Sequence, residues 1–138
     1  MNKKELAKYI DQTTLKPGMT EEYVTGFCED AKKNGFASVC ILPTMIPTAA
    51  KVLKGSDTKV CTVISFPLGM DVPEVKAVET EEAIELGAEE IDLVLNVSAL
   101  KGGNYDIVNE ELSKVVKICH DNGKLIKLII ETPLLNEE

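Results

Sequence analysis

The sequence predicts an α/β protein built from five parallel strands. Two observations carry this prediction. Segments with strand character alternate with segments of helical period along the whole chain, and most strand segments are nearly continuous apolar runs. Strict alternation is typical of parallel strands joined by right-handed crossovers, and apolar strands are typical of sheets covered on both faces. The length of 138 residues leads us to expect a single domain over residues 1–138.

Turn residues divide the first part of the chain into helical and extended segments. The segment 11–15 is partly β-branched and stops at Lys16-Pro17-Gly18, which predicts a strand. Thr20 can cap the helix that follows, which ends at Asn34-Gly35. The elements predicted here are a helix at 3–10, a strand at 11–15, a helix at 20–34, a strand at 37–42, a helix at 46–53 and a strand at 59–66.

The second part of the chain continues the alternation. Pro73 begins a helix that runs to Gly87. Its predicted apolar side consists of Val75, Val78, Ala83, Ile84 and Leu86. The next helix carries an apolar stripe of Val108, Leu112, Val115, Val116 and Cys119. The elements predicted here are a helix at 73–87, a strand at 90–96, a helix at 105–122 and a strand at 125–132.

Two architectures fit five alternating units: an open doubly wound sheet, or part of a (β/α)8 (TIM) barrel. The turn after the first strand lacks the Gly-rich phosphate-binding pattern found in many open sheets, which is weak evidence against them. Polar residues lie two apart on two strands, Asp92 and Asn96 on one and Lys127 and Glu131 on another. Barrel interiors carry such residues near their C-terminal mouth. We therefore favour a partial TIM barrel, about half of a (β/α)8 barrel.

Charge and cysteine usage exclude several classes of protein. The 23 acidic residues outnumber the 15 basic ones, giving a net charge of −8, so we expect no nucleic-acid partner. No apolar run reaches about 18 residues, so we expect no membrane span, and the N-terminus does not resemble a signal peptide. The four cysteines form no CxxC pair and there is one histidine, so we expect no metal site and no cofactor. We read four reduced thiols in a cytoplasmic protein.

Asp92 and Lys127 are the strongest candidates for chemistry. Each lies between apolar neighbours within a strand, so both are expected to be largely buried. If sequential strands are neighbours, the two side chains meet on one face. They then form either a structural ion pair or a proton-transfer or Schiff-base arrangement in which burial lowers the pKa of the lysine. The residues alone leave both interpretations open.

Other polar residues have a plainer interpretation beside the functional one. Asp11 is a strand-starting polar residue, and Cys40, a lone cysteine within a strand, is expected to be a small buried hydrophobe rather than a nucleophile. Glu131 lies at a strand end, where barrels keep functional groups. His120 is expected on the surface at a helix end. A solvated face, not a metal site, is expected for Glu79, Glu81, Glu82, Glu85, Glu89 and Glu90.

Five segments, in order and spanning the chain, resemble the deoxyribose-phosphate aldolase family. Each segment alone is a weakly specific match, and the five in the family's order make the resemblance specific. The segments are Ile10-Asp11-Gln12-Thr13-Thr14-Leu15-Lys16-Pro17, Phe36-Ala37-Ser38-Val39-Cys40-Ile41, Cys61-Thr62-Val63-Ile64-Ser65-Phe66-Pro67-Leu68-Gly69, Gly87-Ala88-Glu89-Glu90-Ile91-Asp92-Leu93-Val94-Leu95-Asn96 and Lys127-Leu128-Ile129-Ile130-Glu131-Thr132.

The resemblance implies a class I aldolase on a TIM barrel, acting in the cytoplasm without a metal. Such an enzyme reversibly cleaves 2-deoxy-D-ribose 5-phosphate to acetaldehyde and D-glyceraldehyde 3-phosphate through a Schiff base. By position, Asp92 resembles the aspartate that relays protons through water, and Lys127 resembles a lysine of the same network. Asp11 resembles a polar residue of the substrate pocket, and Cys40 resembles its cysteine.

The family's Schiff-base lysine lies on the sixth strand, the lysine that tunes it lies on the seventh, and Gly/Ser-rich loops late in the barrel bind phosphate. The chain ends before these segments, at about half of the ~250 residues typical of the fold. We therefore expect activity toward a sugar phosphate or aldehyde only when another half completes the barrel. The alternatives are an inactive oligomeric scaffold or binding module, or Lys127 itself acting as the Schiff-base residue. We also expect a homo-oligomer or a complementing half-barrel to cover the open inner face and the strand edges.

Overall fold

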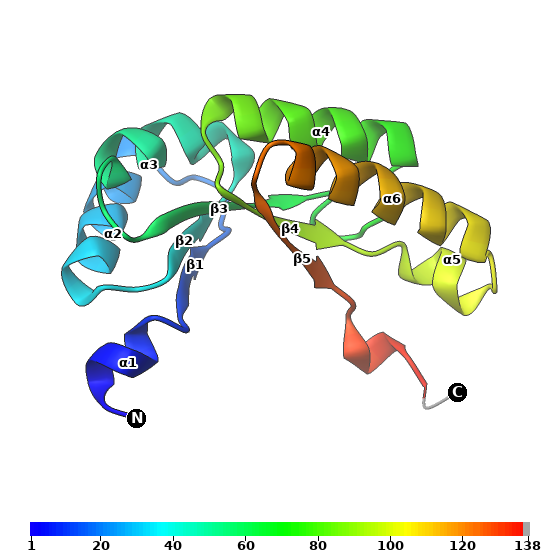
Figure 1. Cartoon of the computed structure of the whole chain (residues 1–138), viewed down its shortest axis with the longest axis horizontal. Helices are drawn as coiled ribbons and strands as arrows, with labels where there is room; N and C mark the ends of the chain where they lie inside the picture. Colours follow the sequence, from blue (N-terminus) through cyan, green and yellow to red (C-terminus); the bar gives the residue numbers. More distant parts are fainter. Residues whose placement is uncertain (137–138) are drawn as a thin grey trace.

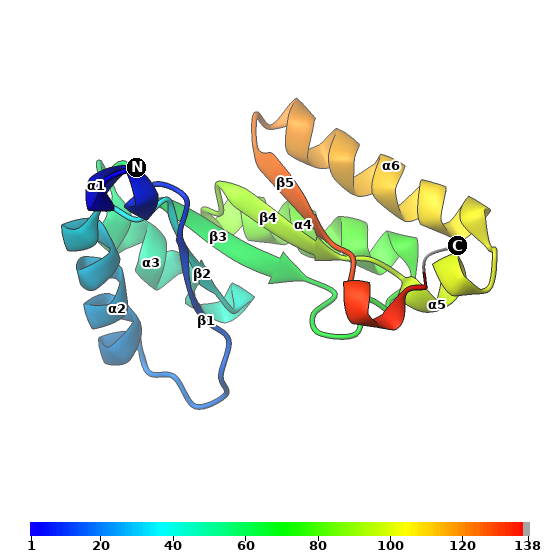
Figure 2. The same cartoon turned by 90° about the horizontal axis from the view of Figure 1, so that it is seen from below.

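The chain forms one parallel sheet of five strands in the order β1-β2-β3-β4-β5 (Figure 1, Figure 2). The structure is a computed structural model that describes residues 1–136. Every neighbouring pair of strands is parallel, which confirms the sequence prediction. The strands are β1 (Asp11–Thr14), β2 (Ser38–Ile41), β3 (Lys59–Ile64), β4 (Glu90–Val94) and β5 (Leu125–Ile129).

Helices connect these strands where the sequence predicts them. Thr20 caps α2 by accepting a hydrogen bond from the Tyr23 backbone N–H, and Gly35 ends that helix in a left-handed conformation. The helices are α1 (Lys3–Ala7), α2 (Glu21–Asn34), α3 (Ile46–Leu53), α4 (Pro73–Leu86), α5 (Val97–Lys101) and α6 (Tyr105–Asp121), with 3-10 turns η1 (Pro43–Met45) and η2 (Thr132–Leu134). The first helix is shorter than predicted.

The short helix α5 was not predicted from the sequence. The predicted strand 90–96 ends at Val94, because Asn96 accepts a hydrogen bond from the Ala99 N–H and caps α5. The expectation that Asn96 shares a strand face with Asp92 is therefore wrong. A capping asparagine and a strand asparagine look alike in a five-residue window.

The four longer helices, α2, α3, α4 and α6, all lie on one side of the sheet (Figure 1). The main core lies between them and the sheet and includes Val39, Ile64 and Ile91. In the described part of the chain no helix covers the other face, which agrees with the open inner face expected of a partial barrel (Figure 1). Cys40, Cys61 and Val63 are nevertheless buried on that inner face, because curvature brings the side chains together.

The curvature of the sheet distinguishes a barrel from an open sheet. Lys127 on β5 donates a hydrogen bond to Asp11 on β1 across 2.6 Å, although these are the outermost strands. In a flat sheet, four inter-strand steps would separate the two strands by about 19 Å. A lysine and an aspartate cannot span that distance, so the sheet is rolled as in a barrel wall.

Helix α4 is rotated relative to the prediction. Val75 and Val78, predicted on its apolar side, are exposed, while Lys76, Thr80 and Ala83 are buried. The reason is an ion pair within the core: Lys76 Nζ lies 2.7 Å from Glu111 Oε2 on α6, and both side chains are fully buried. Hydrophobicity alone did not indicate that a lysine forms the inner side of this helix.

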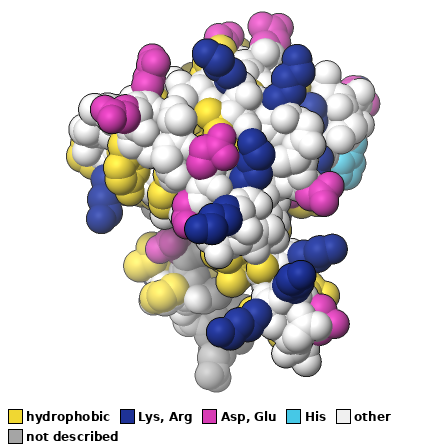
Figure 3. Space-filling view, turned by 90° about the vertical axis from the view of Figure 1, so that its left-hand side faces the viewer, with side chains coloured by type: hydrophobic (Ala, Val, Ile, Leu, Met, Phe, Trp, Pro, Cys, Tyr) yellow, Lys and Arg dark blue, Asp and Glu magenta, His cyan; other side chains and the backbone are white. Residues whose placement is uncertain are grey.

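Hydrophobic side chains remain exposed at both ends of the sheet. Strand β5 is an edge strand, and Leu125, Leu128 and Ile130 in and beside it are exposed. Around α1 and α2, Tyr9 and Tyr23 are exposed as well. Figure 3 shows this side of the molecule, where hydrophobic side chains lie among scattered lysines and acids. Exposed apolar groups and unpaired strand edges favour association with a further surface.

Gly69 closes the loop between β3 and α4 against the end of β4. Its φ is +66°, and a Cβ there would lie 2.2 Å from the Leu95 carbonyl oxygen. We therefore expect Gly69→Ala to lower the free energy of unfolding by at least about 2 kcal/mol, measured by urea denaturation. Gly18 is the matched control, because its φ is +82° but a Cβ there meets nothing within 4 Å. Gly18→Ala should cost only about 1–2 kcal/mol, and equal losses would contradict the close approach at Gly69.

Two further expectations concern the cysteines and the membrane. All four cysteines, Cys28, Cys40, Cys61 and Cys119, are buried and free in this structure. In the described part of the chain, no helix combines the length and the apolar character that crossing a membrane requires.

Candidate functional site

A lysine surrounded by three carboxylates occupies the inner face of the sheet. Lys127 Nζ lies 2.6 Å from Asp11 Oδ2, 3.3 Å from Glu90 Oε2 and 3.3 Å from Asp92 Oδ1. The three acids come from β1 and β4, and the lysine from β5. We call Asp11, Glu90, Asp92 and Lys127 the acid–lysine cluster. Strands far apart in the sequence thus supply one charged site.

Strand geometry explains how the cluster forms. Side chains alternate between the faces of a strand, so Glu90 and Asp92 on β4 project to the same side. Asp92 is the register partner of Lys127, which places the two side by side on neighbouring strands. Ser38, the register partner of Asp11, donates a hydrogen bond of 2.7 Å to Asp11 Oδ1. This bond leaves Oδ2 of Asp11 directed at Lys127.

The acids hold Lys127 in its charged form. Burial alone would lower the pKa of Lys127, but its hydrogen bond to Asp11 and the negative charges around it outweigh burial and raise that pKa above its usual value. The sequence-based expectation of a lowered pKa is therefore wrong. At neutral pH the side chain is an ammonium ion, which can donate protons and hydrogen bonds but is not a free nucleophile.

The two aspartates of the cluster have opposite pKa shifts. Burial tends to raise the pKa of Asp11, but hydrogen bonds from Lys127 and Ser38 outweigh it, and the pKa falls below its usual value. Burial raises the pKa of Asp92, and Lys127 opposes this only in part. Asp92 Oδ1 is buried and accepts no hydrogen bond from the described residues. A carboxylate with a raised pKa and a free lone pair is suited to accept a proton.

This contrast predicts different effects for two conservative substitutions. The folded-state pKa of Asp11 lies below its ordinary 3.8, so the unfolded chain binds its proton first and stability falls as the pH drops below 3.8. We expect Asp11→Asn to lower the free energy of unfolding by about 1 kcal/mol at neutral pH and to weaken this acid dependence.

Asp92→Asn is the matched control. The raised pKa of Asp92 means that its ionised form is disfavoured in the folded chain, so removing the charge should leave stability at neutral pH unchanged or higher. Urea denaturation at several pH values measures both effects. Equal losses of stability in the two variants would contradict the opposite pKa shifts of Asp11 and Asp92.

Two thiols lie beside the cluster. Cys40 on β2 and Cys61 on β3 are register partners, and Cys40 Sγ lies 4.0 Å from Asp92 Oδ2. The neighbouring Cys40 and burial both raise the pKa of Cys61 far above its usual value, so the thiol is protonated. Cys40 thus lies beside the charged residues on the inner face.

All four candidate site residues, Asp11, Cys40, Asp92 and Lys127, are brought together by the fold. Glu90 was missed, although its position two residues before Asp92 on one strand could have indicated it. Glu131 lies outside β5 and is exposed, and His120 is exposed as expected.

The expected solvated acidic face holds for only some of its members. Glu81, Glu82 and Glu85 are exposed. Glu79 accepts a hydrogen bond from the Ser65 N–H, Glu89 pairs with Lys59, and Glu90 belongs to the acid–lysine cluster. The expectation is wrong for Glu79 and Glu90, because both are partly buried by their contacts with the sheet, whereas the side chain of Glu89 stays accessible to solvent in its ion pair.

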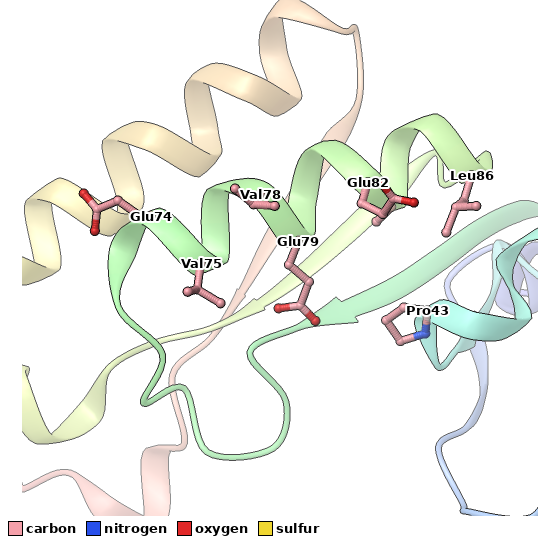
Figure 4. Close-up of a pocket in the computed structure, with 8 residues that line it drawn as sticks. Pro43, Glu74, Val75, Val78, Glu79, Glu82 and Leu86 are labelled. Atoms are coloured by element: carbon pink, nitrogen blue, oxygen red, sulfur yellow. The ribbon is translucent and has the colours of Figure 1, made fainter.

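The most apolar groove lies away from this chemistry. It has a volume of about 460 Å³ and lies along the outer side of α4, between that helix and Pro43. Val75, Val78 and Leu86 form its apolar lining, and Glu74, Glu79 and Glu82 also border it (Figure 4). None of the acid–lysine cluster residues lines this groove. The inner face therefore remains the candidate active site.

A rolled parallel sheet with helices on its outer side and charged side chains on its inner face is typical of the wall of a TIM barrel. A model of the DeoC/LacD family aldolases matches residues 5–138, and the chain belongs to this family. A deoxyribose-phosphate aldolase from Geobacillus sp. (strain WCH70) is 53% identical over 133 residues. That match covers 96% of this chain and 59% of the relative. The chain therefore spans about three fifths of the length of such relatives.

Solved structures agree with this assignment. The deoxyribose phosphate aldolase from Aeropyrum pernix, described as having a unique tetrameric structure, matches with a TM-score of 0.88 at 34% identity. The match covers 98% of this chain and 56% of that one. The aldolase QR15 matches with a TM-score of 0.89 at 38% identity, covering 96% of this chain and 58% of QR15. The partial TIM barrel expected from the sequence is confirmed.

Proposed function

We propose that the chain supplies the first five strands of a deoxyribose-phosphate aldolase barrel. The reaction is the reversible cleavage of 2-deoxy-D-ribose 5-phosphate to acetaldehyde and D-glyceraldehyde 3-phosphate through a Schiff base. The observation that carries the proposal is the acid–lysine cluster on the inner face of a chain that belongs to the aldolase family. The reaction takes place in the cytoplasm, where four free thiols stay reduced.

In this proposal Asp92 and Lys127 transfer protons. Asp92 accepts and returns protons through water, for which its raised pKa suits it, as does an Oδ1 that accepts no hydrogen bond from the described residues. Lys127 is the ammonium member of this network: it can donate a proton, and its charge holds Asp11 and Asp92 in place. Asp11 and Cys40 line the pocket that receives the sugar. The amine that forms the Schiff base and the loops that bind phosphate come from strands beyond the fifth, in a longer form of the chain or in a second polypeptide.

The test is reconstitution of a whole barrel. The chain is co-expressed with the C-terminal part of the Geobacillus aldolase that lies outside the matched 59% of that protein. We expect a complex that cleaves deoxyribose 5-phosphate, and borohydride trapping with acetaldehyde should label a lysine of the added part. Mass spectrometry of the peptides locates the adduct. An adduct on Lys127 would overturn the assignment of that lysine to proton transfer.

The same experiment distinguishes the scaffold alternative. A folded complex of both parts that neither binds nor cleaves the sugar phosphate would favour an inactive oligomeric scaffold or binding module. Trapping of the chain alone is the companion measurement. Since Lys127 is held as an ammonium ion, the chain alone should show only the background labelling of exposed lysines.

We also propose that the chain associates, with itself or with the completing half. Both edge strands are unpaired on one side, and Leu125, Leu128 and Ile130 are exposed at β5. The Aeropyrum relative is described as tetrameric. Light scattering at micromolar concentration should give a mass above that of the 15.0 kDa monomer. A uniform monomer would contradict this prediction.

A further inference from the structure

Two thiols and a carboxylate meet on the inner face, beside the acid–lysine cluster. Within residues 1–136, the Sγ atoms of Cys40 and Cys61 and a carboxylate oxygen of Asp92 all lie within 4.8 Å of one another. They come from β2, β3 and β4, the three central strands of the sheet. We propose that Cys40, Cys61 and Asp92 form a binding site for a soft divalent cation of the Zn²⁺ or Cd²⁺ type.

The geometry suits three protein ligands of a tetrahedral site. Bond lengths of about 2.3 Å to sulfur and 2.0–2.2 Å to oxygen place tetrahedral ligand atoms about 3.5–3.8 Å apart. The three ligand atoms lie within 4.8 Å, so small side-chain rotations bring them to that spacing. Cys40 and Cys61 are register partners on neighbouring strands, which fixes their backbones relative to each other. Cys40 and Cys61 are almost wholly buried. Leu15 and Leu42 pack against them, so the ion would be enclosed at the inner face.

The charges around the site favour an added cation. Asp11, Glu90 and Asp92 surround the single ammonium group of Lys127, which leaves an excess of two negative charges when all four are ionised. The two carboxylate oxygens of Asp92 contact different groups: Oδ1 lies 3.3 Å from Lys127 Nζ, and Oδ2 lies 4.0 Å from Cys40 Sγ. A cation at Oδ2 therefore needs no displacement of Lys127.

Binding displaces protons from both thiols. Each Cys S–H bond breaks as the metal–sulfur bond forms, and two protons pass to solvent without any oxidation or reduction. The complex therefore carries two thiolates and one carboxylate around the divalent ion. Because protons are released, affinity must rise with pH.

A consequence for catalysis rests on the proposed function. A cation held by Asp92 withdraws its carboxylate from proton transfer, so the metal acts as an inhibitor and not as a cofactor. The sequence did not indicate this site, because its ligands are separated by 21 and 31 residues and no short spacing pattern links them.

The experiment is a Cd²⁺ titration of the reduced, full chain, followed by the ultraviolet charge-transfer absorbance of cadmium thiolates. We expect one Cd²⁺ to bind per chain. Cys40→Ser and Cys61→Ser should each lose most of this absorbance. Loss of a residue that only supports a metal ligand weakens metal binding about 10- to 100-fold, and loss of either thiol should weaken Cd²⁺ binding by more than that. Asp92→Asn should weaken binding while keeping the absorbance.

Cys28→Ser and Cys119→Ser are matched controls, since both residues are buried in the core on the other side of the sheet. They should bind Cd²⁺ like the unmodified chain. Absorbance that persists in Cys40→Ser, or that disappears in Cys28→Ser, would overturn the proposal, as would its absence in a chain whose thiols titrate as reduced. If Cys61→Ser does not fold, Cys40→Ser and Asp92→Asn decide the matter.

The outcome is independent of the proposed function. Cd²⁺ binding is measured on the chain by itself, and aldolase activity is measured in the completed barrel with a chelator present. Activity without Cd²⁺ binding contradicts only the metal site, and Cd²⁺ binding without activity contradicts only the aldolase proposal.

Discussion

Replacing Lys76 with methionine is expected to lower the free energy of unfolding by about 3–5 kcal/mol, because it leaves the Glu111 carboxylate buried without a cation. Lys76 Nζ donates hydrogen bonds to Glu111 Oε2 at 2.7 Å and to the Val94 carbonyl at 3.0 Å. Glu111 Oε1 accepts from the Asn96 N–H at 2.9 Å. The pair thus joins α4 and α6 to the end of β4. Urea denaturation, with the dependence of the free energy of unfolding on urea concentration fitted for each variant, measures the loss of stability.

The double variant Lys76→Met with Glu111→Leu distinguishes the cost of an unpaired buried charge from the cost of the hydrogen bonds that the pair makes to the backbone. Removing both charges should recover a large part of the loss, because no uncompensated charge remains. Recovery stays incomplete, since the Val94 carbonyl and the Asn96 N–H lose their partners, at about 1–3 kcal/mol for each buried group. A Lys76→Met chain as stable as the parent would show that water reaches Glu111, contrary to the structure.

In a barrel completed as proposed above, Asp92→Asn is expected to lower kcat by about 10²–10⁴-fold with little change in KM. Asparagine has nearly the same shape as aspartate and can stay in place beside Lys127, but it cannot accept a proton. Because Asp92→Asn is not expected to destabilise the chain, lost activity cannot be attributed to unfolding. Steady-state cleavage of deoxyribose 5-phosphate measures both constants.

The control for this prediction is Lys59→Met. Lys59 begins β3 and pairs with Glu89 in an ion pair whose members are both exposed. Exposed pairs contribute about 0–1 kcal/mol, so kcat and stability should hardly change. An Asp92→Asn enzyme with the parent's kcat would remove Asp92 from the proton-transfer role and leave the acid–lysine cluster a structural feature.

Much of the architecture could be predicted from residue patterns. Turn residues and capping signals separate the segments. The prediction therefore gave both observed ends of α3, and for α2, α4 and α6 it gave one end correctly and the other to within one residue. These signals are local, since a cap or a Gly turn acts within a few residues. The alternation of strand segments with helical segments then predicted parallel strands. With sequential strands as neighbours, the side chains of Asp92 and Lys127 were expected on one face of the sheet.

Where local patterns failed, a distant partner was responsible. Val75 and Val78 were predicted to face the core, yet Lys76 occupies that side because Glu111, 35 residues later, provides the opposite charge. Asn96 resembles a strand residue, but its backbone N–H donates a hydrogen bond to Glu111 Oε1 on α6, 15 residues later. In each case the deciding interaction lies outside the window in which periodicity is measured.

The sequence by itself determined the order of the strands, their parallel pairing and the charged residues that share a face. Only the tertiary structure decided how those residues act together. Rolling the sheet brings Asp11 within 2.6 Å of Lys127 although 116 residues separate them, and it adds Glu90 to the same ammonium group. That arrangement raises the pKa of Lys127 where burial alone would lower it. Charge interactions depend on distance in space, and a sequence gives only distance along the chain.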